Sequence, residues 1–229
     1  FQSVLACIRL TIDLPQEYKG THMSRFIEVL SDWRQKPVSN REMDAMLRDI
    51  MNRLGAQRAH IEIRFKYFIE KVAPVSGLKS LLDYDCVFEG DLGPAGQLNF
   101  ILGIAVPFTS LCPCSREISD YGAHNQRGVM KVRIKYVPGR FIWIEDLVEL
   151  MERQGSCPVY PLLKREDEKF VTEMAYDNAK FIEDVLRDLV LALRGLDGAT
   201  WFEVECESFE SIHNHSAYAF HEEGDKTPA

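Results

Sequence analysis

The sequence predicts an α+β fold with a largely antiparallel sheet and with helices packed on one face. Two observations support this prediction: strand-like segments cluster apart from helix-like segments, and hairpin-length turns join most of the strands. Each half of the chain also has about one pair of helices and a few strands. The similar content of the two halves is compatible with an internal duplication, although no repeat is visible at the level of individual residues.

The first half begins with a strand that is followed by two helices. Residues 3–13 alternate apolar and polar side chains, which is typical of a half-buried strand. After a turn, residues 22–33 predict a helix. A second helix is expected over 42–54, with Ser39 or Asn40 as its N-cap and one apolar face. That face consists of Met43, Met46, Leu47, Ile50 and Leu54.

The middle of the chain predicts a run of strands. Residues 60–71 alternate with period two, and turns containing Gly and Pro separate the segments that follow. The additional strands are expected at 81–90, 97–108 and 129–137. A cysteine-containing loop precedes the last of these strands.

The second half predicts helices and one closing strand. A helix is expected over 142–155, and another over 179–196 with Asp177 or Asn178 as its cap. A final strand over 200–211 leads into the sequence HNHS.

Length and composition indicate a folded globular protein. The chain has 229 residues, of which 46% are hydrophobic, enough for a substantial core. It contains no run of about 18 uncharged apolar residues, and its start lacks a basic segment followed by an apolar stretch, so we expect neither a membrane span nor a signal peptide. Because the first residue is Phe, we expect that residues of the natural chain precede it.

The cysteine content and the net charge argue against a disulfide-rich protein and against a nucleic-acid-binding protein. Six cysteines are too few and too unevenly placed for a disulfide framework, which favours a reducing, cytoplasmic location. Cys7, Cys86 and Cys206 lie in strand-like apolar patterns and are expected to be buried as small hydrophobic residues. The net charge of -8 argues against nucleic-acid binding, which needs a cationic face. An anionic ligand would need a local basic cluster.

The segment 110–128, SLCPCSREISDYGAHNQRG, concentrates reactive side chains in an expected loop. Cys112 and Cys114 are only two positions apart, which is too short a step for both thiolates to bind one metal ion comfortably. One of them is therefore expected to act as a ligand or nucleophile beside the other. His124 is close enough in sequence to fold back over the same site.

The absence of a second cysteine pair favours a catalytic metal site, with three protein ligands, over a closed structural one. The remaining ligands would then come from elsewhere in the chain. The candidates are Glu210, His213 and His215 near the final strand, and Glu166, Glu168 and Glu173 in an acidic stretch.

Simpler interpretations exist for several of these residues. The run KREDEK is most simply a solvated charge run, and a single histidine such as His213 is more often structural than a metal ligand. Glu183 lies four residues before Arg187 on an expected helix, which is the spacing of a surface ion pair.

Two groups of basic residues could meet phosphates. Lys19 and Arg25 flank a helix start at THMS, where free backbone N–H groups could bind an anion. Arg116 and Arg127 bracket the cysteine segment. For Lys19 and Arg25, solubility and helix capping are equally simple interpretations.

Several segments together resemble a known family. SLCPCSREISDYGAHNQRG closely resembles the corresponding motif of the prokaryotic type IB GTP cyclohydrolases. The same holds for KGTHMSRF (19–26), APVSGLKSLLDYDCVFEG (73–90), LLKREDEKFVTE (162–173), NAKFIEDVLRD (178–188) and ESIHNHSAYA (210–219). These segments span almost the whole chain.

The resemblance implies an activity and an architecture. It implies a hydrolase, acting on a cyclic amidine C–N bond, that converts GTP and water into 7,8-dihydroneopterin triphosphate and formate, the first step of folate synthesis. It implies the tunnelling fold, with two modules at approximately 1–110 and 111–229, and a homotetramer with sites at subunit interfaces. It also implies a divalent metal, Zn²⁺ or Mn²⁺, with Fe²⁺ as a further option.

The resemblance also implies roles for individual residues. It makes Cys112 the metal-binding thiolate, with Cys114 as the alternative, and Glu168 and His213 the other ligands. His124 matches an active-site histidine that could also bind the metal. Glu183 matches an active-site carboxylate, and Glu210 matches the glutamate that anchors the N–H edge of a purine. Substrate contacts are expected from Lys19, His22, Ser24, Arg25 and Arg127.

This chemistry agrees with the residues themselves. A divalent ion can generate hydroxide to attack C8 of the purine, while His124 or Glu183 moves protons. An ionised Glu210 could accept two N–H bonds from guanine, which distinguishes it from adenine.

Two alternatives remain open at this point. A nitrile reductase of the tunnelling fold would use Cys112 as a nucleophile with NADPH and no metal. A metal-storage or redox-sensing module would use Cys112 and Cys114 as a switchable pair.

Overall fold

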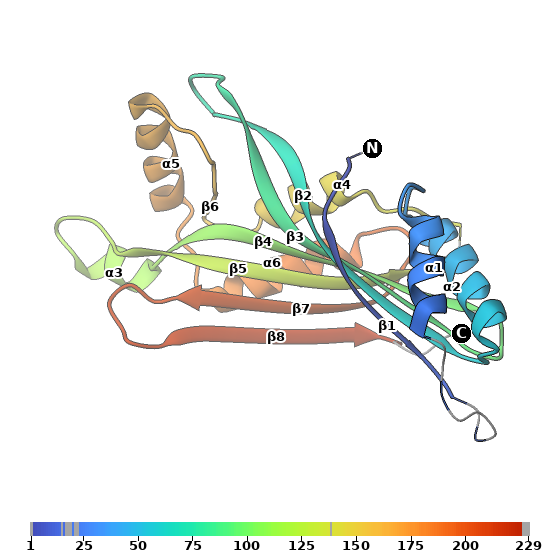
Figure 1. The fold of residues 1–229 in the computed structure, drawn as a ribbon. Helices are drawn as coiled ribbons and strands as arrows, with labels where there is room; N and C mark the ends of the chain where they lie inside the picture. Colours follow the sequence, from blue (N-terminus) through green and yellow to red (C-terminus); the bar gives the residue numbers. More distant parts are fainter. Residues whose placement is uncertain (1, 15, 17–19, 21–22, 138, 226–229) are drawn as a thin grey trace.

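The computed structural model describes residues 2–14, 16, 20, 23–137 and 139–225. Its helices are α1 (Met23–Trp33), α2 (Asn40–Leu54), α3 (Pro113–Ile118), α4 (Ile144–Glu152), α5 (Arg165–Asp177) and α6 (Ile182–Arg194). Its strands are β1 (Ala6–Ile12), β2 (Ala59–Val72), β3 (Lys79–Leu92), β4 (Leu98–Leu111), β5 (Asn125–Tyr136), β6 (Cys157–Pro158), β7 (Ala199–Phe209) and β8 (Ser216–Gly224). Figure 1 shows their arrangement.

The described strands form a single antiparallel sheet. Their order is β1-β2-β3-β4-β5-β7-β8, and the short β6 pairs with β4 beside this path. Each long strand therefore pairs with the next long strand in the sequence. Helices lie in the connections from β1 to β2, from β4 to β5 and from β5 to β7. This confirms the predicted α+β class with an antiparallel sheet.

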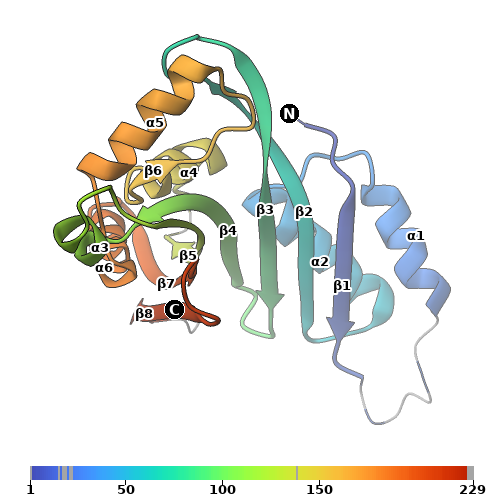
Figure 2. The same ribbon diagram turned by 90° about the vertical axis from the view of Figure 1, so that its left-hand side faces the viewer.

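The helices pack on one face of the sheet, as predicted. α2 contacts β2 and β3, α4 contacts β4, and α6 contacts β7 and β8, so that the helices follow the twist of the sheet in Figure 2. Four of the five apolar residues predicted for α2 are buried, and Leu54 is half-buried. Fully burying a side chain of this size contributes about 1.5–3 kcal/mol, so this face is sufficient to anchor α2.

The other face of the sheet carries cross-strand ion pairs. Along β5, Met130 and Val132 point into the core, while Lys131 and Arg133 alternate onto the opposite face. Arg133 pairs with Glu89 of β3 at 2.5 Å and with Glu203 of β7 at 3.1 Å. The sheet thus separates an apolar layer under the helices from a charged surface.

The cysteine segment is more ordered than the predicted loop. β4 continues to Leu111, β5 begins already at Asn125, and residues 113–118 between them form α3. Pro113 starts α3, where a missing N–H costs nothing because the first N–H groups of a helix have no partner within it. The prediction of an irregular segment over 110–128 was therefore wrong at both ends and in its centre.

The second half also differs from its prediction. α5 and β8 were not predicted, and α6 begins at Ile182 rather than at Ala179. The cap is Phe181, not Asp177 or Asn178, because the Asp184 side chain accepts the Phe181 N–H at 3.2 Å and closes the first turn there.

The non-site cysteines differ in burial. Cys86 and Cys206 are buried as predicted, whereas Cys7 is exposed because β1 is an edge strand and Cys7 points away from the helix layer. In the described residues, no helix is both long and apolar enough to cross a membrane.

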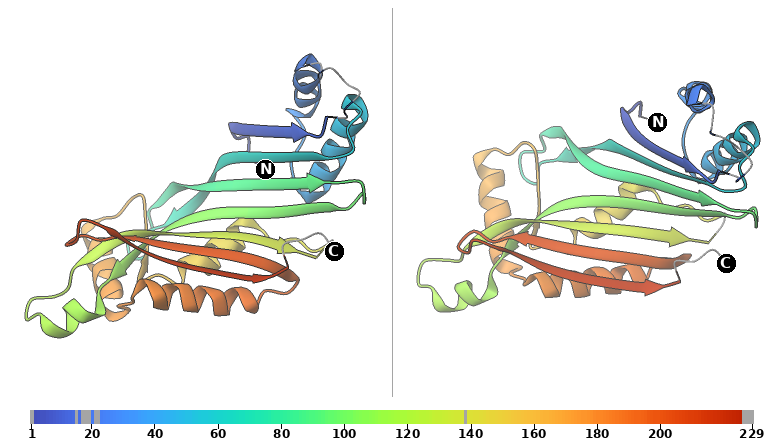
Figure 3. Two further views of the ribbon diagram at one scale, coloured as in Figure 1. Left: turned by 90° about the horizontal axis from the view of Figure 1, so that it is seen from below. Right: turned by 60° about the horizontal axis from the view of Figure 1, so that its bottom comes forward.

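The two ends of the sheet carry different elements. α3, α5 and the connection between β7 and β8 lie at one end, and α1 and α2 lie at the other (Figures 1 and 3). Three of the segments that the sequence singled out are therefore neighbours in space.

Candidate active site

Main-chain hydrogen bonds hold Cys112 and His124 beside each other. The Cys112 N–H donates to the His124 carbonyl at 3.1 Å, and the His124 N–H donates to the Ser115 hydroxyl at 3.2 Å. That hydroxyl donates in turn to the Cys112 carbonyl at 3.1 Å. The structure thus brings together the two residues that sequence reasoning expected to meet. Cys112 is half-buried at the start of α3, whereas Cys114 is exposed within it.

A polar chain connects His124 to Glu210. His124 Nδ1 lies 3.0 Å from Gln126 Oε1, and Gln126 Nε2 donates to Glu210 Oε1 at 3.3 Å. The Ser208 hydroxyl donates to the same carboxylate oxygen at 3.0 Å. Gln126 and Ser208 are both buried. Sequence reasoning missed these two residues, and only their places in β5 and β7, beside His124 and Glu210, could have indicated them.

The connection between β7 and β8 carries the predicted histidines. His213 and His215 are exposed, and their rings stack with centroids 5.2 Å apart. The Ser211 Oγ lies 3.4 Å from His124 Nδ1, which ties this connection to the cysteine segment. Glu210 and His213 therefore lie on the same short connection, and its first residues contact His124 through Gln126 and Ser211.

The acidic run contains a buried carboxylate as well as exposed ones. Asp167 is fully buried in the first turn of α5. Its Oδ1 accepts the N–H groups of Val75 and Ser76 at 2.8 and 2.9 Å, and its Oδ2 accepts the Ser76 hydroxyl and the Lys164 N–H at 2.6 and 2.9 Å. We call this arrangement the Asp167 clasp. It fastens the tip of the β2–β3 hairpin to the helix that carries the exposed Glu168.

The electrostatics of the clasp require an ionised Asp167. Burial by itself would raise the pKa of Asp167, but the Ser76 hydroxyl and the N–H groups of Ser76, Lys164 and Val75 stabilise the charged form and hold the pKa well below its ordinary range. The interpretation of KREDEK as a solvated charge run is therefore wrong for Asp167, which is the one member of the run that is buried.

The same hairpin has a second anchor nearer the core. Lys71 of β2 forms a part-buried ion pair with Glu152 of α4, and the Tyr84 hydroxyl of β3 donates to Glu152 at 2.7 Å. The hairpin is thus attached both to α4 and, through the clasp, to α5.

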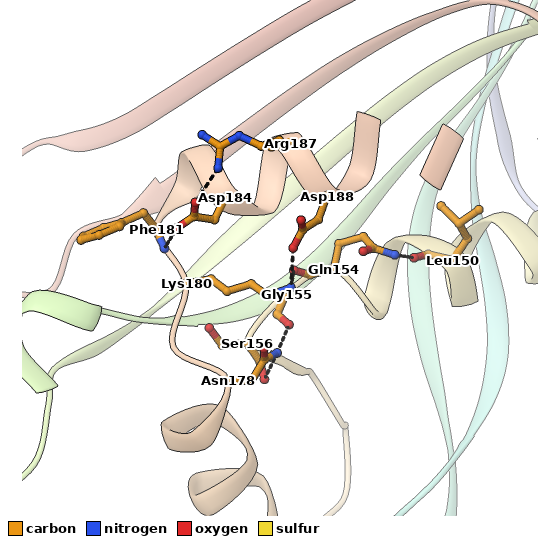
Figure 4. Close-up of polar contacts among 10 residues, drawn as sticks. All are labelled: Leu150, Gln154, Gly155, Ser156, Asn178, Lys180, Phe181, Asp184, Arg187 and Asp188. Atoms are coloured by element: carbon orange, nitrogen blue, oxygen red, sulfur yellow. Dashed lines mark hydrogen bonds and ion pairs between the residues drawn. The ribbon is translucent and has the colours of Figure 1, made fainter. Parts of the chain in front are cut away.

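Side-chain contacts also fix the start of α6 (Figure 4). Lys180 Nζ donates to the Gln154 carbonyl at 3.1 Å and to Asp188 at 2.8 Å, while the Asn178 amide donates to the Gly155 carbonyl at 2.9 Å. The Lys180 N–H also donates to the Leu111 carbonyl at 3.2 Å, just before Cys112. These contacts place the beginning of α6 beside the cysteine segment.

Glu183 is exposed in the first turn of α6. Arg187 pairs with Asp184 at 2.7 Å, and among the described residues no ion pair joins Arg187 to Glu183. The simpler interpretation of Glu183 as the ion-pair partner of Arg187 is therefore wrong.

The expected substrate residues lie apart from this cluster within one chain. Ser24 and Arg25 are exposed on α1, at the opposite end of the sheet, and Arg25 donates to the Arg53 carbonyl at 3.3 Å. Arg127 is exposed on β5, on the face opposite to Gln126. Lys19 and His22 lie outside the described residues. Arg116 stacks on Tyr176, 4.5 Å from the ring centroid, and so helps to hold the end of α5.

The donor types at this end of the sheet suit a divalent ion. Thiolate, imidazole and carboxylate are available from Cys112, His213 and Glu168. Among the residues described, however, no group of three or more His, Cys, Asp or Glu side chains within one chain is placed to hold a metal ion.

Solved structures with a similar fold identify the structural class. Uricase from Arthrobacter globiformis matches with a TM-score of 0.59 at 6% identity, covering 99% of this chain and 91% of that one. A hyperthermostable mutant urate oxidase of Bacillus sp. TB-90 matches with a TM-score of 0.52 at 9% identity, covering 89% and 77%. At such identities the likeness concerns the fold alone, and this fold is the tunnelling fold.

Sequence comparison then identifies the family: the chain belongs to the type I GTP cyclohydrolases of the folE2 kind, whose family model, "Type I GTP cyclohydrolase folE2", matches residues 1–219. GTP cyclohydrolase FolE2 of Geotalea uraniireducens is 57% identical over 218 residues, which cover 95% of this chain and 79% of that protein. The protein of the same name from Geobacter sulfurreducens is 55% identical over 219 residues, covering 96% and 83%. The resemblance stated from the motifs is thereby confirmed.

Proposed function

We propose that this protein is a GTP cyclohydrolase that converts GTP and water into 7,8-dihydroneopterin triphosphate and formate, the first step of folate synthesis. One observation carries the proposal: in a chain of this family, a main-chain hydrogen bond holds Cys112 beside His124, and the His124 imidazole is linked through the Gln126 amide to Glu210. The relatives compared above support neither the nitrile reductase nor the metal-storage alternative.

Glu210 is proposed to bind the guanine base. A carboxylate that accepts two N–H bonds from one edge of guanine discriminates against adenine, which presents a different pattern of donors. In the described part of the chain, both hydrogen bonds of Glu210 fall on Oε1, so Oε2 remains available to a ligand. Ser208 and Gln126 orient the carboxylate for this contact.

His124 and Glu183 are proposed to move protons during ring opening. Water must add to C8, the C8–N bond must break with a proton delivered to the departing nitrogen, and the resulting formamide must be hydrolysed to formate. A positioned acid or base typically contributes about 10²–10⁴-fold to such steps. The contacts of Lys180 hold the start of α6, and hence Glu183, beside the cysteine segment.

A divalent metal is also part of the proposal, as Zn²⁺ or Mn²⁺ with Fe²⁺ as a further option. Cys112, Glu168 and His213 would hold it, with Cys114 as the alternative thiolate and His124 as a possible additional ligand. When bound, such an ion supplies Lewis acidity and makes water a stronger nucleophile near neutral pH.

The proposed assembly is a homotetramer with sites between subunits. Ser24 and Arg25 lie at the end of the sheet opposite to Cys112, so a second copy is needed to bring them to the cysteine segment. The described sheet ends in the edge strands β1 and β8, whose outer backbone groups can pair with another copy. We retain the division into modules at 1–110 and 111–229 as part of this proposal, because each half contains both helices and long strands of the sheet.

Incubation with GTP tests the activity directly. The purified protein, supplied with Zn²⁺ or Mn²⁺, is expected to form a product that becomes a fluorescent pterin on oxidation. Without added metal and after chelation, the signal should disappear and return when the ion is restored. Oxidation of NADPH with a nitrile substrate, and no pterin, would instead favour the nitrile reductase.

The variant Glu210→Gln tests the guanine contact. We expect its KM for GTP to rise by roughly 10–100-fold, because a neutral amide loses one charge-assisted acceptor and presents a donor to the N–H edge. Metal content, measured by elemental analysis, should change little. Glu207→Gln, three residues earlier on β7, serves as the matched control. Loss of metal from Glu210→Gln would show that the roles of Glu210 and Glu168 must be exchanged.

A further inference from the structure

We propose that Gln126 is a positioning residue that fixes the tautomer of His124. Its amide is oriented by the carboxylate of Glu210, and this orientation decides which nitrogen of His124 carries the proton. The proposal uses the proposed function only for the roles of these two residues. The inference about the tautomer itself rests on the geometry of the side chains.

The side-chain amide of Gln126 is buried and contacts both His124 and Glu210. Gln126 lies in β5, is 8% exposed, and its amide stands between the imidazole of His124 and the carboxylate of Glu210. Ser208, which is 1% exposed, holds the same carboxylate oxygen from the other strand. A buried amide between two polar groups is expected to satisfy both.

The charge of Glu210 determines which way the amide points. An ionised carboxylate only accepts hydrogen bonds, so the NH₂ group of Gln126 must face Glu210. The carbonyl oxygen of Gln126 then faces His124, and it can only accept. Nδ1 of His124, 3.0 Å away, must therefore carry the proton.

The consequence for His124 is a defined tautomer. With the proton on Nδ1, Nε2 has a free lone pair and can accept a proton or bind a cation. The Ser211 hydroxyl oxygen, 3.4 Å from Nδ1, lies where a second acceptor for the same N–H would be. The group proposed to recognise guanine and the group proposed to move protons are thus connected through one amide.

This connection also explains why the site spans two strands. Gln126 belongs to β5, whereas Glu210 follows β7, and the two strands pair up to Gly128 and Ser208. A shift of the carboxylate on binding would be transmitted through the amide to the imidazole over two hydrogen bonds. Ligand position and proton position are therefore coupled without a moving backbone element.

Nuclear magnetic resonance of protein labelled with ¹⁵N-histidine tests the tautomer without substrate. Long-range ¹H–¹⁵N correlation distinguishes Nδ1–H from Nε2–H, and a spectrum of His124→Asn identifies the signal of His124. We expect Nδ1–H in the as-purified wild-type protein. A wild-type His124 with its proton on Nε2 would overturn the proposal whether or not the protein has cyclohydrolase activity.

Two variants distinguish the contact of Gln126 with His124 from its contact with Glu210. Gln126→Leu removes both contacts, so the Nδ1–H signal of His124 should be lost and kcat should fall by roughly 10–100-fold. Gln126→Glu still accepts from Nδ1 but places a second carboxylate against Glu210, so the tautomer should be kept while KM for GTP rises. Lys131→Gln, on the outer face of the same strand, should change neither. If Gln126→Leu keeps the tautomer, or if both variants alter kcat and KM equally, Gln126 does not have this role.

Discussion

Replacing Cys112 with alanine is expected to reduce pterin formation by more than about 10³-fold, because Cys112 is one of the three residues proposed above to hold a divalent ion, which would supply the Lewis acidity for the reaction. The fold should be retained. The contacts that hold Cys112 in the structure are made by its backbone, to His124, Ser115 and Arg116, and alanine keeps all of them. Turnover with GTP, metal content and the far-ultraviolet circular dichroism spectrum measure the three expectations.

Cys114→Ala is the matched control for this experiment. Cys114 is exposed within α3, two residues away, so its removal should leave most of the activity and metal content. The opposite result, an inactive Cys114→Ala and a nearly normal Cys112→Ala, would assign the thiolate to Cys114. Near-normal pterin formation by both variants would remove the cysteines from the mechanism.

The substitution Asp167→Asn is expected to have the largest effect on stability among the changes near the site. The Asp167 carboxylate accepts four hydrogen bonds from the hairpin tip and the start of α5. In asparagine an NH₂ group replaces one of the two oxygens, so it would face N–H or O–H donors without an acceptor for them. We expect a fall in Tm of roughly 5–10 °C. The hairpin tip should also become susceptible to proteolysis, while the anchor through Glu152 keeps the rest of the hairpin in place.

The pH dependence of this effect has a definite sign. The pKa of Asp167 is lowered in the folded protein, so its contribution is fully present above the pKa of the unfolded chain, about 3.9, and is lost as the pH falls further toward the folded value. The difference in Tm between wild type and Asp167→Asn should therefore be constant above about pH 5 and shrink below about pH 4.

Glu166→Gln provides the control, since Glu166 is exposed in the same turn of α5. It should shift Tm by no more than about 2 °C. An equal loss of stability in both variants would show that the effect comes from the charge of the helix start rather than from the clasp.

The sequence predicted best those elements in which apolar side chains recur at a regular spacing. β2 and α2 were predicted nearly to their ends, because period-two alternation and one apolar helix face are properties of neighbouring residues. α5 was missed because it begins with the charged residues REDEK, a pattern that the sequence analysis interpreted as a solvated charge run rather than as the first turn of a helix. β8 was missed because its residues alternate only between half-buried and exposed, and its large apolar side chains, Tyr218 and Phe220, lie on the more exposed face.

The candidate site was predictable only where its members are close in sequence. Cys112 and His124 are separated by a short helix, and hydrogen bonds across that helix bring them together as expected. Gln126 carried no chemical signal by itself. Its position between His124 and Glu210 depends on the pairing of β5 with β7, and Gln126 and Glu210 are 84 positions apart in the chain.

The sequence by itself determined the antiparallel sheet, the packing of helices on one of its faces, and the closeness of Cys112 to His124. These follow from periodicity and short-range spacing. Only the tertiary structure decided which carboxylate of the acidic run is buried and which amide joins the site. Asp167 and Val75 are 92 positions apart, and burial of a charge is tolerated only where the fold supplies hydrogen-bond donors from such distant segments.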